Sequence, residues 1–171
     1  MKKTSPKKRT QTAKPNSQAT SEKFLLKRIL VPIDFSEHSK NALTYAASFA
    51  KTFDAELLLV YVVEPTVYPA DFGFGQVVPP AIEKEVRERG SKGLDQLVKQ
   101  QIAVGVKARA IIRTGKPFLE IIDTAREQEI DLIIIATHGH TGVEHILFGS
   151  TAEKVVRKAP CPVLVVCSPE R

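Results

Sequence analysis

Short apolar runs and amphipathic stretches alternate along the chain from about residue 25 onward. The apolar runs are nearly continuous, as expected for strands that are buried on both faces of a parallel sheet. Between them, apolar residues recur every three or four positions, which is the period of a helix with one buried face. The predicted strands cover residues 26–34, 55–64, 106–113, 131–137 and 161–167. The predicted helices cover residues 36–51, 81–102, 118–128 and a segment that begins near residue 150.

This order of elements predicts an α/β fold: a single domain with a parallel sheet that carries helices on both faces. Two strands differ from the others. Residues 106–110 alternate apolar and charged side chains, which is typical of a strand at the edge of a sheet. Residues 161–167 are apolar on both faces, so that strand is either central or covered by something outside the domain.

The predicted helix 81–102 contains two glycines, Gly90 and Gly93. Because glycine is a poor helix former, we expect them to loosen the middle of the helix. The apolar residues expected on its buried face are Ile82, Val86, Leu94, Leu97, Val98 and Ile102.

The positive charge of the chain is confined to its first residues. The net charge is +6, and residues 1–23 hold seven Lys or Arg side chains and one acidic residue, which accounts for all of it. The rest is formally neutral, which argues against a nucleic-acid-binding face on the folded part. Residues 1–24 hold hardly any large apolar side chain, so we expect a disordered basic arm that at most binds polyanions weakly. Residues 25–171 form the predicted folded domain.

Composition places the protein among soluble globular proteins, with 43% hydrophobic and 26% charged residues. No apolar run approaches the ~18 residues of a membrane span, and the first residues contain no apolar signal core. We therefore expect a cytoplasmic protein that does not insert into a membrane.

The candidate site lies in the stretch ATHGHTGVEHILFGSTAEK, residues 136–154. It follows a predicted strand, and open parallel sheets bind ligands beyond the carboxyl ends of their strands. Ser150 and Glu153 have the spacing of a capping box, and a helix N-terminus is a site for anions. Gly149 allows close approach of the backbone, while Gly139 and Gly142 add exposed amide donors. The stretch fits a phosphate group, but ordinary turns followed by a helix cap would explain it equally well.

A metal site is the weaker hypothesis for the same stretch. His138, His140 and His145 could supply nitrogen ligands, but no Cys or carboxylate stands where it would complete a tetrahedral set. We therefore predict no metal site. No motif of a known hydrolase, metalloprotease or paired-carboxylate enzyme is present, and no catalytic residue is assigned.

Asp34 is the one acidic residue whose position suggests a functional role, because it lies at the carboxyl end of the first predicted strand. It could contact a nucleotide or its magnesium ion. It could equally be the N-cap of the helix that begins near Ser36.

The segments RILVPIDFSEHSKNAL and DLIIIATHGHTGVEHILFGSTAEKVVRKAPCPVLVV resemble the universal stress protein family. Nucleotide-binding members carry the motif G-x2-G-x9-G-[ST]. In this chain nine residues separate Gly139 from the pair Gly149-Ser150, in agreement with that spacing. The resemblance covers residues 25–168.

The resemblance implies a doubly wound domain with strand order 3-2-1-4-5 and a homodimer that pairs through the last strand, residues 161–167. It also implies an adenine nucleotide, ATP or else AMP or ADP, with Mg²⁺ carried by the phosphates. Pro32, Ile33 and Asp34 would face the base and ribose, and Val62 would touch adenine. The glycine stretch would hold the phosphates through Gly139, Gly142, Gly149, Ser150 and Thr151, flanked by Ala136, His138 and His140.

Two positions depart from the family pattern. Ala136 replaces the first glycine of the motif, and a left-handed conformation there would cost ~1 kcal/mol. His140 occupies a position that is often basic in relatives, and it is largely neutral at pH 7. Both changes would weaken nucleotide binding without excluding it.

Three functions follow. The first is a regulatory module of the stress response that binds ATP and acts on an unknown protein partner. The second is a slow ATPase or phosphoryl-transfer enzyme, in which His138 or His140 would position the acceptor. The third is a dimeric interaction scaffold that binds no nucleotide. The loop 65–80, which is rich in Pro and Gly, is either a lid or a plain surface loop.

Overall fold

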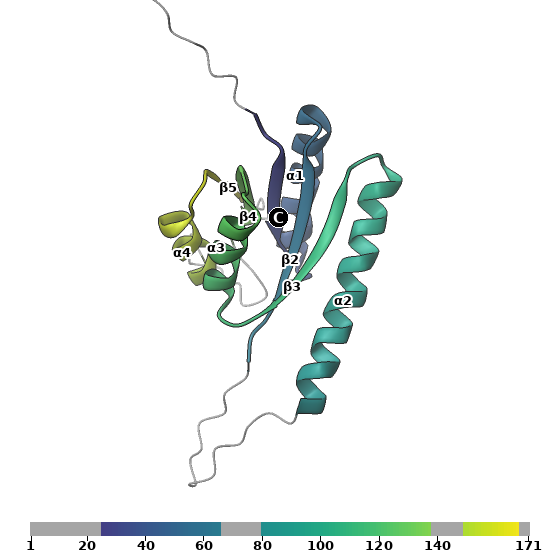
Figure 1. Cartoon of the computed structure of the whole chain (residues 1–171), viewed down its shortest axis with the longest axis vertical. Coiled ribbons are helices and arrows are strands. Elements are labelled where there is room, and N and C mark those ends of the chain that lie inside the picture. Colours follow the sequence, from purple (N-terminus) through teal and green to yellow (C-terminus); the bar gives the residue numbers. More distant parts are fainter. Residues whose placement is uncertain (1–24, 66–79, 138–148, 168–171) are drawn as a thin grey trace, which may run out of the picture.

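The computed structural model describes residues 25–65, 80–137 and 149–167. Figure 1 shows these residues as strands and helices that alternate along the chain. The strands are β1 (Arg28–Pro32), β2 (Glu56–Val63), β3 (Ala108–Thr114), β4 (Leu132–Ala136) and β5 (Val163–Val166). The helices are α1 (Glu37–Phe53), α2 (Pro80–Ala103), α3 (Pro117–Glu127) and α4 (Ser150–Lys158).

The strands form one parallel sheet in the order β3-β2-β1-β4-β5. This confirms the predicted fold class and the strand order that the family resemblance implied. It also places β3 at one edge, as its alternating side chains predicted. The apolar strand β5 lies at the other edge.

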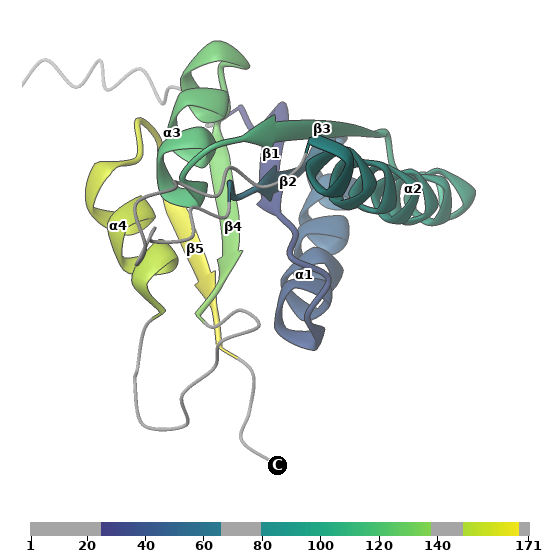
Figure 2. The same ribbon diagram turned by 90° about the horizontal axis from the view of Figure 1, so that it is seen from below.

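Helices cover both faces of the sheet, as the predicted parallel arrangement requires. Figure 2 shows α1 and α2 on one side of the strands and α3 and α4 on the other. In β1, Ile29 packs toward α1 and α2, whereas Leu30 belongs to the cluster beneath α3 and α4, and both are fully buried. The central strands are therefore continuous apolar runs because each of their faces is inside the protein.

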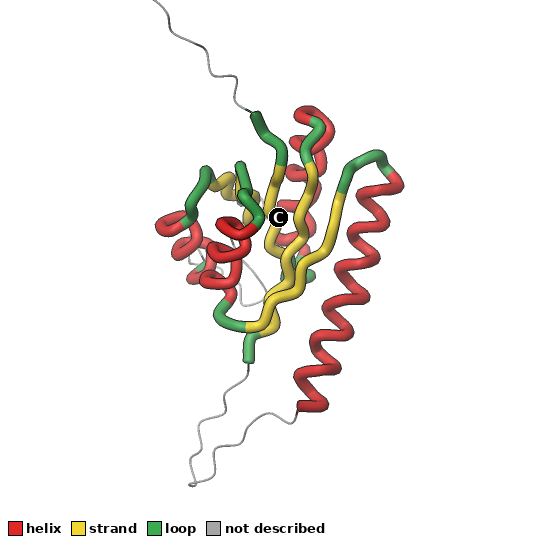
Figure 3. Tube along the Cα trace, viewed as in Figure 1, coloured by secondary structure: helices red, strands yellow, loops and turns green. Residues whose placement is uncertain are grey.

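Helix α2 runs without interruption through both of its glycines, so they do not break it. The helix is also longer than the sheet that it covers, and its first turns extend beyond the strand ends in Figure 3. Leu94 is fully buried, but Val86 and Ile102 near the two ends are 39% and 56% exposed. The predicted apolar stripe is thus buried only in its central part.

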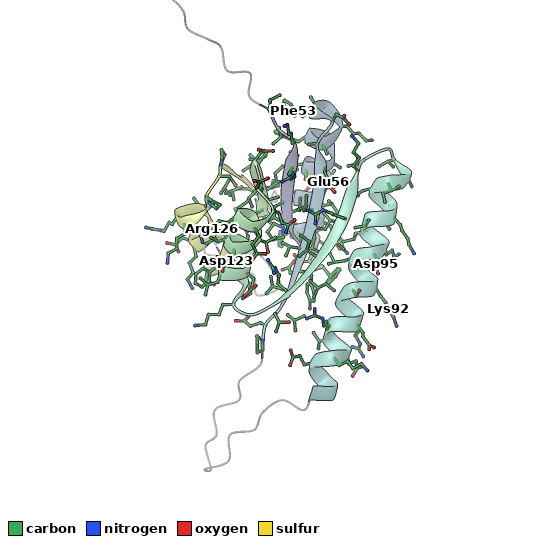
Figure 4. The ribbon with its side chains drawn as sticks, in the orientation of Figure 1. Phe53, Glu56, Lys92, Asp95, Asp123 and Arg126 are labelled. Atoms are coloured by element: carbon green, nitrogen blue, oxygen red, sulfur yellow. The ribbon has the colours of Figure 1, made fainter. Side chains whose placement is uncertain are left out.

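The outer surfaces of the helices carry charged side chains. Lys92 and Asp95 project from α2 away from the sheet, and on α3 Arg126 pairs with Asp123 at 3.0 Å (Figure 4). Within the part of the chain that the structure describes, no helix is both long and apolar enough to cross a membrane.

Candidate functional site

A cavity of about 270 Å³ opens at the carboxyl ends of β1, β2 and β4. It lies beside the pair β1 and β4, where the strand order of the sheet reverses. The chain leaves β1 through α1 on one face and leaves β4 toward α4 on the other face. Diverging connections leave a crevice between neighbouring strands, and ligands of open α/β sheets bind there.

One end of the cavity is an apolar slot between the sheet and α3. Val60 and Val62 of β2 form its floor, and Pro117 and Ile121 of α3 form one wall. Pro117 is the first residue of α3, a position at which the amide proton that proline lacks would have no partner in the helix. The helix therefore begins at the rim of the cavity without loss of a hydrogen bond. A flat aromatic base fits a slot of this composition, because such slots bind by apolar contact. The apolar residues that line it are Pro32, Ile33, Val60, Val62, Pro117, Ile121 and Ile135.

Asp34 supplies a carboxylate to the cavity, two residues after the end of β1. Its Oδ1 accepts hydrogen bonds from the amide of Ser36 at 3.0 Å and from the hydroxyl of Ser36 at 2.5 Å. Ser36 is itself the N-cap of α1, because its Oγ also accepts a bond from the amide of Ser39 at 3.2 Å. The alternative that Asp34 caps α1 is therefore wrong. Ser36 caps the helix and at the same time fixes the orientation of the Asp34 carboxylate.

The opposite end of the cavity is polar and is formed by the first turn of α4. The first hydrogen bond of this helix runs from the amide of Glu153 to the carbonyl of Gly149, at 3.1 Å. The amides of Ser150, Thr151 and Ala152 precede that bond, and they have no backbone acceptor among the described residues. Unpaired amides at a helix N-terminus, together with the helix dipole, attract an anion.

The predicted capping box at this helix is wrong in register. Gly149 is the N-cap and Ser150 is the first helical residue, so the Ser150 hydroxyl does not cap α4. The amide of Gly149 donates to the carbonyl of Thr137 at 2.8 Å, which ties the helix start to the end of β4. The place of Gly149 in the motif had suggested that it holds the phosphates. Its amide is already used in this bond and is therefore not free to donate to a phosphate. Its contribution is the absence of a side chain at the rim.

Ala136 lies at the end of β4, where it pairs with Val166 of β5. Its φ angle is not among the positive ones of the described residues, so the expected cost of a left-handed alanine does not arise. The substitution of glycine by alanine at this position adds one methyl group to the cavity wall and no backbone strain.

The structure thus brings together eight of the residues predicted from the sequence, and all of them line the cavity: Pro32, Ile33, Asp34, Val62, Ala136, Gly149, Ser150 and Thr151. The other four, His138, Gly139, His140 and Gly142, lie outside the described residues, as do the basic arm and most of the loop 65–80. Sequence reasoning missed the other seven described lining residues: Val60, Tyr61, Pro117, Ile121, Ile135, Thr137 and Ala152. Pro117 and Ile121 could have been found, because a helix that follows β3 must begin at the same edge of the sheet as the site.

The described lining residues include no Lys or Arg. Negative charge on a ligand would therefore be met by amides, hydroxyls and the dipole of α4. Among the described residues, no group of three His, Cys, Asp or Glu side chains could hold a metal ion. The histidines considered for a metal site, His138, His140 and His145, lie in the segment that the structure does not describe.

The model of the universal stress protein family matches residues 26–166. The chain belongs to this family. Universal stress protein MJ0531 of Methanocaldococcus jannaschii is 36% identical over 159 residues, which are 91% of each chain. Universal stress protein YxiE of Bacillus subtilis is 33% identical and covers 83% of this chain and 99% of its own.

Solved structures of the family share the fold. The structure of MJ0577, a universal stress protein of Methanocaldococcus jannaschii, superposes with a TM-score of 0.73 at 30% identity, over 86% of this chain and 99% of that one. Two further universal stress proteins were solved with adenine nucleotides. One is a complex with cAMP, with a TM-score of 0.63 at 19% identity, over 84% of this chain and 98% of that one. The other, from Archaeoglobus fulgidus, is a complex with dAMP, with a TM-score of 0.57 at 21% identity over the same shares.

Proposed function

We propose that this universal stress protein binds ATP in the cavity and that nucleotide occupancy regulates its interaction with a protein partner in the stress response. The observation that carries the proposal is the arrangement of two unlike ends in one cavity. An apolar slot lies between β2 and α3, and the amides at the start of α4 have no backbone acceptor among the residues that the structure describes. A nucleotide has the same two-part character, with an aromatic base at one end and an anion at the other.

In this proposal the base occupies the slot against Val62, and Asp34 accepts a hydrogen bond from the ribose. The amides and hydroxyls of Ser150 and Thr151 hold the phosphates. Magnesium would enter with the nucleotide, because Mg²⁺ in such sites keeps several waters and is bound by phosphates and one or two carboxylates. The family members solved with cAMP and dAMP support an adenine nucleotide as the ligand class.

We favour binding over catalysis because of what the described cavity contains. Asp34 is its one carboxylate, and that group already accepts two hydrogen bonds from Ser36. The described lining residues offer no His, Lys or second carboxylate that could act with Asp34 as a general acid or base. The arrangement suits a carboxylate that is held still for recognition.

We also propose that the protein acts as a cytoplasmic homodimer that pairs through β5. This strand lies at the edge of the sheet, and an apolar edge strand requires a partner or a cover. The amide of Ile133 donates to the carbonyl of Pro162 and that of Thr137 to the carbonyl of Val166. Because strand residues alternate in direction, the main-chain groups of Val163 and Val165 point to the open edge.

The nucleotide proposal is tested on freshly purified protein. Denaturing it and separating the supernatant by chromatography should release ATP, ADP or AMP. If no nucleotide is released, calorimetric titration of the protein with magnesium-ATP should show binding with a stoichiometry of one per chain. Absence of both results would contradict the proposed function.

A further inference from the structure

The backbone at Phe35 has an unusual conformation. Its φ angle is +66°, in the left-handed region that glycine adopts freely and bulky residues avoid. A non-glycine residue stays in that region only where its surroundings hold it there, and such residues gather at functional sites. Phe35 lies between Asp34, which lines the cavity, and Ser36, which caps α1.

Two contacts hold the Phe35 ring. Its centroid lies 5.1 Å from that of Tyr61, with the planes tilted by 50°. The ring also packs against α2 at Gly93, where an added Cβ would lie 2.7 Å from Cε1 of Phe35. The helix can approach the ring this closely only because Gly93 has no side chain. The close contact thus makes the position of α2 and the position of Phe35 depend on each other.

The backbone conformation of Phe35 in turn determines whether its two neighbours, Asp34 and Ser36, can form a hydrogen bond. The Ser36 amide reaches Oδ1 of Asp34 at 3.0 Å across the Phe35 residue, so the turn at Phe35 closes this hydrogen bond. A change in the φ angle of Phe35 would rotate the Ser36 amide away from the carboxylate. The carboxylate would then lose part of what orients it in the cavity.

We propose that Phe35 is a positioning residue that couples helix α2 to the Asp34 carboxylate in the ligand cavity. Movement of α2 against the sheet changes the orientation of Asp34, and a ligand that contacts Asp34 changes how tightly α2 is held. The two effects are equal in free energy, because coupling between two sites is reciprocal. The proposal rests on the proposed function only in its choice of ATP as the ligand.

The test uses the full chain with Gly93→Ala, which places a methyl group against the Phe35 ring. Alanine favours a helix over glycine, so helix propensity alone predicts a more stable protein with unchanged binding. The coupling predicts instead about tenfold weaker binding of magnesium-ATP by calorimetry. It also predicts faster hydrogen exchange of the Ser36 amide in the ligand-free protein, measured by NMR. Phe35→Leu in the same chain makes room for the methyl group and should restore most of both values.

Leu97→Ala is the matched control, because it removes a half-buried apolar contact of α2 one turn after Gly93 and leaves both Gly93 and Phe35 unchanged. It should lower the melting temperature and leave ATP affinity and Ser36 exchange unchanged. Phe35→Gly, which adopts the left-handed conformation without strain, should also weaken binding because the ring that fixes the turn is gone.

Two results would overturn the proposal. One is wild-type affinity and wild-type Ser36 exchange in both Gly93→Ala and Phe35→Gly. The other is an equal loss of affinity in Leu97→Ala, which would assign the effect to general destabilisation. If wild-type protein binds no ATP, the proposed function fails, whereas Ser36 exchange in the ligand-free variants still decides the coupling.

Discussion

The role of main-chain amides in the site can be isolated with Ser150→Pro. Ser150 is the first residue of α4, a position at which proline is favoured because its missing amide proton has no partner in the helix. The residue before a proline must be extended, and Gly149 already has φ −65° and ψ 148°. The first hydrogen bond of the helix begins at Glu153 and is unaffected. The substitution therefore removes the Ser150 amide donor together with the Ser150 hydroxyl and keeps α4.

The size of the effect follows from the kind of bond that is lost. A hydrogen bond from an amide to a charged acceptor contributes about 1.5–3 kcal/mol. Each ~1.4 kcal/mol is a factor of ten in affinity, so ATP should bind about 10- to 150-fold more weakly. Because Ser150 is exposed and lies outside the helical hydrogen-bond ladder, the free energy of unfolding should change by less than about 0.5 kcal/mol.

Ser150→Ala is the matched control, since it removes the hydroxyl and keeps the amide. We expect it to weaken binding less than Ser150→Pro, when both are titrated with magnesium-ATP by calorimetry at one salt concentration. Thermal unfolding without ligand should show that both variants fold. The reasoning is refuted if Ser150→Pro binds ATP like the wild type, or if Ser150→Ala loses as much affinity as Ser150→Pro.

Three further substitutions test other parts of the structure. Gly149→Val should fold, because Gly149 has an extended backbone conformation that any residue can adopt. The variant should purify without nucleotide, and a bound nucleotide would contradict the placement of the phosphates. Val165→Pro removes an outward-facing amide from β5 and spares the bonds to β4, so light scattering should report a monomer, and an intact dimer would contradict pairing through this edge. Gly115→Ala introduces a side chain at φ +152°, where its Cβ would lie 2.5 Å from Oε1 of Glu120. A loss of ~1 kcal/mol should lower the melting temperature by about 2–4 °C, and an unchanged midpoint would show that the turn relaxes.

Much of the fold was predictable because each strand and helix has its own hydrophobic period. Burial on both faces makes β2 and β4 continuous apolar runs, and the half-polar alternation of β3 correctly indicated an edge. The order of the strands came from the family resemblance, because the hydrophobic period of a strand does not indicate which strands lie beside it in the sheet. The eight predicted site residues that the structure describes do line one cavity, because strand ends of a parallel sheet meet at one edge.

What could not be predicted depends on contacts between distant segments. The spacing of Ser150 and Glu153 fits a capping box, but the bond between the Gly149 amide and the Thr137 carbonyl determines where α4 begins. Helix propensity similarly treats Gly90 and Gly93 as weaknesses. In the folded chain, the space that a side chain would need at these positions is occupied by the rings of Tyr61 and Phe35.

The two edges of the sheet are chemically unlike, and this limits how the protein can assemble. On β3, Arg109 is tied to Glu56 and Gln128, and Arg113 to Thr124 and Glu127, so that edge is bordered by fixed charges. The β5 edge consists of Val and Leu. A chain with two adhesive edges could add copies without end and form a fibre. With only one such edge, the proposed pairing through β5 would join two copies and leave no second apolar edge for a third.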